Sequence, residues 1–433
     1  MKFKIKKYIK FLKYFILKKS YLLRNPKLTA YLWVIFSDVL FSSENSKKRS
    51  VLVFKNGGGD LDLLSRPKNR VNNERYLCID KSTTDDLFMS FFGFKSFDYT
   101  YESSIKKQQK NYKKYSNFIN SVVNSLNKQH HIIGFINFNH VYSSHREIMN
   151  VAENKKIPFV VVFKECFRNK NLWQDTIEAY KHLIKKSNPS KTLVHNHDSK
   201  LALLTSGIID EKKITIIGQA RSDKLFLKKE RLRYSRKKIL FFTISPTAGV
   251  PVFSLDLLPN RSKDERERKF LIEKRIKHNK KILSSLINYV EKNKEFDLIV
   301  KGKQRFWFDY KKMKMNNVFF NSGPPDFNLL LSSNLVIGYN TTGLVEAIAA
   351  DIPAISVEIK EDIKYRHDYK DVIHQVNDVG FLWKKLDQIL NDEIIQDNKN
   401  KNYILDKYLG NSDGKAGIRL WNELDGIWNQ KFN

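Results

Sequence analysis

The sequence predicts an α/β protein of two consecutive domains, each built on a doubly wound parallel sheet. The chain has 433 residues, whereas one domain typically takes about 100–200 residues. From residue 51 onward, short apolar runs alternate with polar helical stretches, which is the pattern of βαβ units. A charged stretch, 222–237, lacks a strand pattern and divides the two series. We therefore expect a cleft between the domains, beyond the carboxyl ends of the strands.

The net charge indicates an anionic partner. The chain carries 78 Lys and Arg against 46 Asp and Glu, a formal net charge of +32. This excess favours nucleic acid, an anionic membrane or a phosphorylated ligand. A drift of the amino-acid composition towards residues with A/T-rich codons explains much of this positive charge equally well. The two cysteines, Cys78 and Cys166, exclude a disulfide framework and a Cys-X-X-Cys zinc site, so a reducing, cytoplasmic setting is expected.

Residues 1–48 have the pattern of a basic amphipathic segment ahead of the first domain. Apolar residues recur there at helical spacing between lysines, at Ile5, Ile9, Leu12 and Ile16. Such a helix suits an anionic bilayer, so we expect residues 1–24 to hold the protein peripherally at the inner face of the cell membrane. Packing of this helix on its own domain is the alternative. The next apolar run, 28–41, is shorter than the ~20 residues of a membrane span and is expected to be a core helix or an interfacial segment.

The first domain is predicted to cover 49–228. Short apolar runs predict its strands at 51–54, 76–79, 132–136, 158–163, 192–194 and 214–217. Longer polar stretches predict its helices at 103–128, 144–154, 172–186 and 200–206. His195 and His197 precede the last helix, and we expect them to line the cleft as loop residues because no third metal ligand accompanies them.

The second domain is predicted to cover 229–433. The same criteria predict its strands at 238–243, 296–300, 318–320, 335–337 and 354–357, and its helices at 264–293 and 344–350. The remaining residues, 376–433, are expected to form a mostly helical tail of this domain. The sequence contains no internal repeats.

The most informative stretch is 334–356, where a buried strand leads through a small polar turn into a helix. The turn consists of Asn340, Thr341, Thr342 and Gly343, and the helix carries Glu346. A helix start offers unpaired N–H groups and a partial positive charge, and a threonine hydroxyl can reach a phosphate. The pattern predicts an anion site. A capped helix without a ligand explains the same residues.

Other polar residues follow strands of the second domain, where ligands gather. Lys301 follows one predicted strand, and its ammonium could pair with a phosphate. Ser322 and Gly323 follow another and could border a nucleotide base, and Ser245 follows the first. A solvated lysine, a plain turn and an ordinary loop are the respective alternatives.

The segment 334–356 resembles the donor-binding segment of glycosyltransferases with the two-domain GT-B fold. Similar segments occur in nucleotide-sugar 2-epimerases and in CDP-glycerol glycerophosphotransferases. Three weaker matches lie in the same order along the chain, and together the resemblance covers roughly 190–420. The first, 217–226, resembles a G-x-P-R-x-D segment, with Ala220 where proline is usual.

The second weaker match, 298–303, resembles a strand end that reads hydrophobic-K-P-H-P in the family. Gly302 and Lys303 replace its proline and histidine, which puts a histidine role there in doubt. The third match, 413–419, resembles a terminal D-G-K-A-x-x-R segment.

The resemblance implies two Rossmann-like domains that face each other across a cleft. It places the pyrophosphate of a nucleotide-activated donor on the second domain, at the helix start, with Glu346 on the donor ribose. The first domain, 49–228, would bind the acceptor and supply the base. No cofactor is implied beyond the nucleotide-activated co-substrate, and no bound metal.

Transfer with inversion needs a group that deprotonates the acceptor hydroxyl. Glu165 follows the strand at 158–163 and would face the cleft. Asp60 follows a run of three glycines, and His145 begins a helix after another strand. A surface or capping role explains each of the three equally well.

Residues near these candidates are expected to bind the acceptor. Lys164 and Arg168 flank Glu165 and would attract an anionic acceptor. Gly58 and Gly59 would let a sugar approach the backbone closely.

These features predict a glycosyltransferase that moves a sugar from a nucleotide-sugar donor to a cell-surface polysaccharide or lipid-linked glycan. We expect the transfer to invert the configuration at the anomeric carbon and to require no metal ion. CDP-glycerol-type glycerophosphotransfer is the closest alternative, followed by nucleotide-sugar 2-epimerisation. A basic nucleic-acid-binding protein remains a further alternative, but no RNA- or DNA-binding motif appears, so nucleic acid is not the expected partner.

Overall fold

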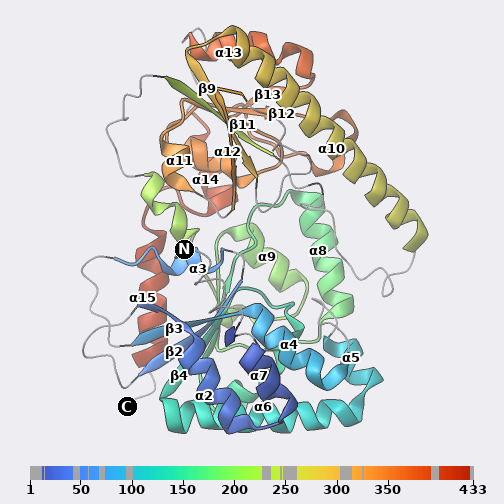
Figure 1. The fold of residues 1–433 in the computed structure, drawn as a ribbon, viewed down its shortest axis with the longest axis vertical. Helices are drawn as coiled ribbons and strands as arrows, with labels where there is room; N and C mark the ends of the chain where they lie inside the picture. Colours follow the sequence, from blue (N-terminus) through green and yellow to red (C-terminus); the bar gives the residue numbers. More distant parts are fainter. Residues whose placement is uncertain are drawn as a thin grey trace.

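The computed structural model has an α/β fold with two parallel Rossmann-like sheets, which confirms the predicted fold class. The domains are stacked along the long axis of the molecule (Figure 1). The structure describes residues 12–13, 15–41, 49–56, 58–67, 74–93, 101–226, 236–243, 246, 261–302, 315–323, 326–391 and 399–429. Residues 1–11 of the predicted amphipathic helix and Ser245 lie outside these ranges.

The first sheet has seven strands in the order β1-β3-β2-β4-β5-β6-β7. All neighbouring strands are parallel except β1, which pairs antiparallel with β3 at the edge. The strands are β1 (Asp38–Phe41), β2 (Ser50–Lys55), β3 (Arg75–Asp80), β4 (Ile132–Asn137), β5 (Phe159–Phe163), β6 (Lys191–Val194) and β7 (Ile214–Ile216). Every predicted strand of this domain is therefore present, and β1 is an additional one.

Helices cover both faces of the first sheet. The helices are α2 (Pro26–Phe36), α3 (Asp60–Leu63), α4 (Lys81–Phe92), α5 (Tyr101–Lys107), α6 (Gln109–His130), α7 (Ser143–Asn154), α8 (Lys170–Leu183) and α9 (His197–Thr205), with 3-10 turns η2 (Glu211–Lys213) and η3 (Ala220–Leu225). The sequence prediction missed α4, because its core residues Leu87, Phe88 and Phe91 follow a run of polar residues in the sequence. These helices carry most of the apolar core of the domain.

The N-terminal segment is only partly separate from the first domain. Leu17 and Tyr21 are buried in its core, and Trp33 of α2 donates a hydrogen bond to the Tyr21 hydroxyl at 3.0 Å. The predicted apolar run 28–41 divides into α2 and the edge strand β1, which corrects the single helix or interfacial segment expected there. Within the described residues, no helix is long and apolar enough to span a membrane.

The second sheet has six strands, all parallel, in the order β10-β9-β8-β11-β12-β13. Its strands are β8 (Lys237–Phe242), β9 (Phe296–Gly302), β10 (Val318–Ser322), β11 (Leu335–Gly338), β12 (Ala354–Val357) and β13 (His374–Val376). Apolar side chains from α10 (Arg261–Lys292) and α13 (Leu382–Leu390) cover one face. The other face is covered by α11 (Phe327–Leu331), α12 (Thr342–Ala349) and α14 (Lys401–Leu409). The 3-10 turns η6 (Lys360–Tyr365) and η7 (Val379–Phe381) lie between these elements.

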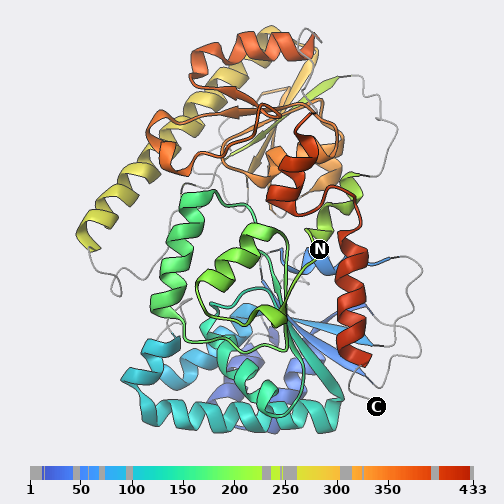
Figure 2. The ribbon, with the colours of Figure 1, turned by 180° about the vertical axis from the view of Figure 1, so that it is seen from behind.

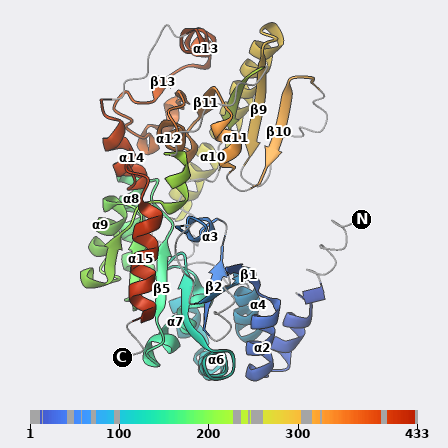
Figure 3. The same ribbon diagram turned by 90° about the vertical axis from the view of Figure 1, so that its left-hand side faces the viewer.

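The last helix, α15 (Ala416–Asn429), crosses back to the first domain (Figure 2). It lies beside β5 in the side view of Figure 3. Its apolar side chains Leu420, Trp421, Leu424 and Trp428 share a core with strands of the first sheet. Trp428 Nε1 donates to the Tyr76 hydroxyl at 2.9 Å. The helical tail therefore does not belong entirely to the second domain, as 229–433 implied, because the apolar stripe of α15 is buried against the first sheet.

Candidate functional site

A cavity of about 370 Å³ lies between the two domains, at the carboxyl ends of both sheets. Residues of β5, β8, β9 and α12, or of the loops that follow these strands, line its wall. It is the place where open α/β sheets bind ligands. Ten residues singled out in the sequence line it: Gly58, Lys164, Glu165, Lys301, Gly323, Asn340, Thr341, Thr342, Gly343 and Glu346.

The start of α12 forms the centre of the second-domain wall. Thr341 is the N-cap, and its Oγ1 accepts the Gly343 N–H at 3.3 Å. Asn340 before it has a left-handed backbone, with φ of 44°. A side chain at Gly343 would place its Cβ 2.5 Å from the Phe242 ring, so only glycine fits beside β8. Close packing thus fixes the helix start at the edge of the cavity, where its dipole favours an anion.

Lys301 ends β9 beside this helix start. Its Nζ donates to the carbonyl oxygens of Gly323 at 2.9 Å and Gly302 at 3.3 Å. Burial lowers the pKa of Lys301, although Asp326 partly opposes the shift. The ammonium is therefore held by neutral partners at the cavity wall, where a phosphate would be a favourable additional partner. Ser322, at the end of β10, does not line the cavity.

Glu346 lies one turn into α12 and is almost fully buried in the cavity wall. Burial raises the pKa of its carboxyl group, while the positive charge of Arg221 opposes the shift. Glu346 thus lies at the cavity wall and is electrostatically linked to the first domain through Arg221. Its role on a ribose stays a prediction.

The sequence prediction missed Arg275 of α10. This fully buried guanidinium lines the cavity, and its Nε donates to Asp362 Oδ2 at 2.8 Å. Its Nη1 also donates to the carbonyl oxygen of Pro246 at 3.3 Å. No local signal marks Arg275, because it lies within a helix in which lysines and arginines are frequent.

Three of the predicted first-domain residues form the facing wall. Glu165 and Lys164 follow β5, and Gly58 precedes α3 with φ of 98°. Glu165 Oε2 lies 3.3 Å from Arg168 Nη2, and about a third of the Glu165 side chain is exposed. Arg168 does not line the cavity, and it donates through Nη1 to Thr176 of α8. Arg168 therefore orients the Glu165 carboxylate from outside the cavity lining.

Three other predicted first-domain residues do not line the cavity. Asp60 is buried at the start of α3, with Lys55 Nζ 3.5 Å from its Oδ2. Gly59 packs against Phe138, whose ring would lie 2.4 Å from an added Cβ. Asp60 and Gly59 are thus packed within the first domain and do not face the cavity.

His145 is the third of these residues, and it is enclosed in the core of the first domain. Its ring stacks on Phe54 with centroids 4.5 Å apart, and its Nε2 lies 2.8 Å from Thr84 Oγ1. Burial holds the pKa of His145 well below its usual range. The structure therefore places it as a neutral core histidine.

The two domains touch directly beside the cavity. The ring of Phe167, which follows β5, stacks on His367 of the second domain with centroids 4.1 Å apart. Asn169 Nδ2 donates to the carbonyl oxygen of Arg366 at 3.0 Å. Both Phe167 and His367 line the cavity, so the contact closes one side of it.

Two of the family-like segments form a single junction between the domains. Asp223, in the segment 217–226, accepts the backbone N–H groups of Ala416 at 3.1 Å and Gly417 at 2.7 Å. Asp223 thereby caps the start of α15, which follows the D-G-K sequence at 413–415. The carboxylate also accepts from Asn411 Nδ2 at 2.8 Å. The segments 217–226 and 413–419 thus act together to attach α15 to the first domain.

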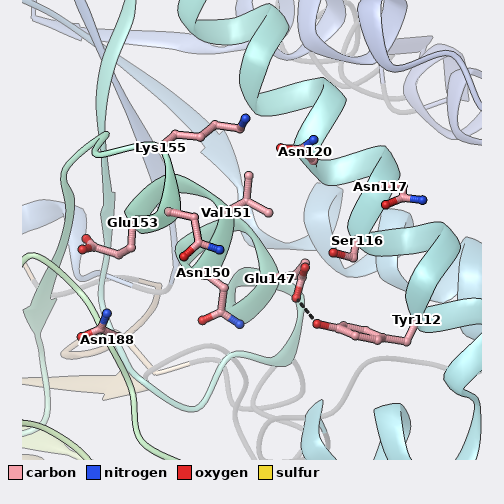
Figure 4. Close-up of a pocket in the computed structure, with 11 residues that line it drawn as sticks. Tyr112, Ser116, Asn117, Asn120, Glu147, Asn150, Val151, Glu153, Lys155 and Asn188 are labelled. Carbon is pink, nitrogen blue, oxygen red and sulfur yellow. Dashed lines mark hydrogen bonds between the residues drawn. The ribbon is translucent and has the colours of Figure 1, made fainter.

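A second hollow, of about 580 Å³, lies on the first domain between α6 and α7 (Figure 4). Its wall is polar and contains five asparagines. Glu147 at its floor is buried and accepts hydrogen bonds from the hydroxyls of Tyr112, at 3.2 Å, and Tyr101. It shares no lining residue with the interdomain cavity and belongs to a different part of the surface.

Similarity to solved structures supports the GT-B-like arrangement of the two domains. A structure of the wall teichoic acid polymerase TagF, soaked with CDPG, is 12% identical with a TM-score of 0.52, over 98% of both chains. A second TagF structure is 11% identical with a TM-score of 0.50, over 98% of this chain and 99% of that chain. A protein from Listeria monocytogenes, named as a UDP-N-acetylglucosamine 2-epimerase, is 12% identical with a TM-score of 0.50, over 89% of this chain and 98% of that chain. No protein-family model and no curated protein sequence matches the chain.

Proposed function

We propose that the protein is a glycosyltransferase that moves a sugar from a nucleotide-sugar donor to a surface polysaccharide or lipid-linked glycan. The proposal rests on one observation: a helix start, three buried or half-buried cations and a partly exposed carboxylate of the first domain line the same cavity. The cations are Lys301, Arg275 and Arg221, and the carboxylate is Glu165. A donor with an anionic diphosphate and an acceptor with a reactive hydroxyl match these groups.

The donor would bind to the second-domain wall. Its diphosphate would meet the N–H groups at the start of α12 together with Lys301 and Arg275. Glu346, one turn into this helix and in the cavity wall, would bind the ribose hydroxyls. We place the base of the nucleotide near Gly323, because this loop borders the same cavity.

The reaction would proceed with Glu165 as general base. Its carboxylate takes the proton of the acceptor hydroxyl while the hydroxyl oxygen attacks the anomeric carbon of the sugar. The bond between that carbon and the diphosphate oxygen breaks, and the nucleoside diphosphate leaves. The fixed cations of the second domain stabilise its developing charge, so the proposed reaction uses no metal ion.

The same cavity would accept a CDP-linked polyol, and the likeness to TagF over 98% of both chains favours this second candidate. Glycerophosphotransfer breaks the diphosphate itself and releases CMP, whereas glycosyl transfer releases a nucleoside diphosphate. A 2-epimerase would act on a UDP-linked sugar without an acceptor. The nucleotide that is released, and the need for an acceptor, therefore separate the three reactions.

Calorimetric titration with UDP, CDP and their sugar or glycerol conjugates tests the proposal. We expect one nucleoside diphosphate to bind, and its conjugate to release that diphosphate when a lipid-linked glycan acceptor is added. Absence of all nucleotide binding would contradict the proposal.

We also propose that the N-terminal helix contacts an anionic membrane. Its residues Leu22 and Leu23 are 62% and 70% exposed, whereas Leu17 and Tyr21 face the domain core. Exposed apolar side chains among lysines suit a bilayer surface. Replacement of both leucines by serine should reduce sedimentation with phosphatidylserine vesicles but not with neutral ones. Unchanged sedimentation would contradict this contact.

A further inference from the structure

An ion network that the proposed reaction leaves unexplained lies next to the first-domain wall. Asp62 of α3 is fully buried, and its carboxylate accepts a hydrogen bond from His195 Nε2 at 3.0 Å. The same carboxylate accepts the backbone N–H of Arg221 at 2.9 Å, and Arg221 Nη1 lies 3.5 Å from its Oδ2. Three segments that are far apart in sequence thus meet at one carboxylate. This arrangement differs from the expectation that His195 would be a loop residue lining the cleft.

Of these three residues, only Arg221 lines the interdomain cavity. Its side chain is 14% exposed, and its Nε has no hydrogen-bond partner among the described residues. Its charge also acts on Glu346 of α12, across the domain boundary. Arg221 therefore lies between a fixed carboxylate of the first domain and the donor-side helix of the second.

The network keeps a positive charge at the cavity. Burial lowers the pKa of His195, but the Asp62 carboxylate and Cys166 together outweigh burial and raise that pKa to about 9. At neutral pH, Asp62 is thus shared by two cations, the imidazolium and the guanidinium. An anionic ligand in the cavity would complete the charge balance.

We infer that Arg221 binds the diphosphate of the donor from the first-domain side, and that Asp62 and His195 are positioning residues that hold its guanidinium in place. The inference rests on the proposed function, because it requires a diphosphate at the start of α12. A guanidinium presents a planar pair of donors that matches phosphate oxygens. Because Asp62 fixes it beforehand, little ordering is needed as charge develops on the leaving group.

The test compares Arg221→Gln with Arg419→Gln. Arg419 belongs to the same interdomain junction, since its Nε donates to the Ile217 carbonyl oxygen at 2.9 Å and its Nη1 to Asp413 at 2.7 Å. It does not line the cavity, which makes it a matched control for a purely structural role. Both variants, and Arg221→Lys, are titrated with the nucleoside diphosphate that binds the unmodified protein and with the corresponding nucleoside.

We expect Arg221→Gln to weaken binding of the diphosphate by roughly 10- to 100-fold, the usual effect of losing a charged hydrogen bond. Affinity for the nucleoside should not change, and Arg221→Lys should restore part of the loss. Arg419→Gln should leave both affinities unchanged. Equal losses of affinity in the two glutamine variants, or equal losses for diphosphate and nucleoside, would overturn this inference but not the proposed function. Failure of the unmodified protein to bind any nucleotide would overturn the proposed function as well.

A double-mutant cycle tests the positioning role of Asp62. Asp62→Asn should weaken diphosphate binding by itself, and it should add little in the presence of Arg221→Gln, because Asp62 acts through Arg221. Additive losses of affinity would show that Asp62 acts independently and would contradict a positioning role.

Discussion

The two walls of the interdomain cavity differ in how they are built. On the second-domain side, the residues singled out in the sequence meet in space: Lys301, Gly323, Asn340, Thr341, Thr342, Gly343 and Glu346 line the cavity, and only Ser322 of the described candidates does not. On the first-domain side, Glu165, Lys164 and Gly58 line it, whereas Asp60, Gly59, His145 and Arg168 do not. The difference shows which kind of site a local pattern can specify.

The second-domain wall depends on one continuous strand–turn–helix unit. Its capping threonine, its left-handed Asn340 and its crowded Gly343 are neighbours in sequence, so their geometry follows from local rules. The first-domain wall combines loops that follow different strands. It is supported by long-range contacts, such as that between Asp62 and His195. Experiments on the two walls should therefore give different kinds of response.

The largest effect is expected on the first-domain wall. Replacement of Glu165 by Gln removes the proposed base and should lower the turnover number by about 10²- to 10⁴-fold, the usual contribution of general base catalysis. Nucleotide affinity should stay close to that of the unmodified protein, because most of the groups proposed to bind the donor belong to the other wall. Steady-state kinetics with donor and acceptor, together with calorimetry, measure both quantities.

Asp60→Asn is the comparison for Glu165→Gln, because Asp60 is also a first-domain carboxylate but does not line the cavity. It should keep a turnover number close to that of the unmodified protein. A loss as great as that of Glu165→Gln would assign the base to Asp60 instead of Glu165.

The next effect concerns the pH dependence of stability. Burial lowers the pKa of His195, but Asp62 and Cys166 together raise it from 6.5 to about 9 in the folded protein, so the protonated form is stabilised by folding. Its contribution is fully present below pH 6.5 and is lost as the pH rises through 9, by about 3 kcal/mol in total. Urea unfolding at several pH values should show this fall in the free energy of unfolding. Identical pH dependence in His195→Gln would contradict it.

A smaller effect is expected on the second-domain wall. In Gly343→Ala the new Cβ would lie 2.5 Å from the Phe242 ring, and such overpacking typically costs about 1–3 kcal/mol. The urea midpoint and nucleotide affinity should fall together. Gly426→Ala in α15 is the control, since its Cβ would meet nothing within 4 Å, and it should stabilise the protein by about 0.5–1 kcal/mol.

The smallest effect is expected for the helix cap. Thr341→Val removes the hydroxyl that accepts the Gly343 N–H, which should cost about 1 kcal/mol of stability. Thr341→Ser keeps that oxygen and should behave like the unmodified protein in thermal unfolding. If Thr341→Ser lost nucleotide affinity and Thr341→Val did not, the threonine methyl group rather than the cap would matter at this wall.

Most of the fold could be predicted from the sequence, because continuous apolar runs such as 158–163 specify buried parallel strands. The predictions failed where an element depends on distant partners. Residues 38–41 form the edge strand β1 only because β3 pairs with them. The sequence predicts a mostly helical tail over 376–433, but it could not identify which sheet would bury α15.

The sequence by itself thus determined the alternation of strands and helices and the polar turn at the start of α12. These features depend on residues within one turn or one strand of each other. Tertiary structure alone decided that Glu165 rather than His145 faces the cavity, that Asp223 caps α15 and that Asp62 joins His195 to Arg221. Each of these contacts joins segments that only the packing of the two sheets brings together, so no local pattern specifies it.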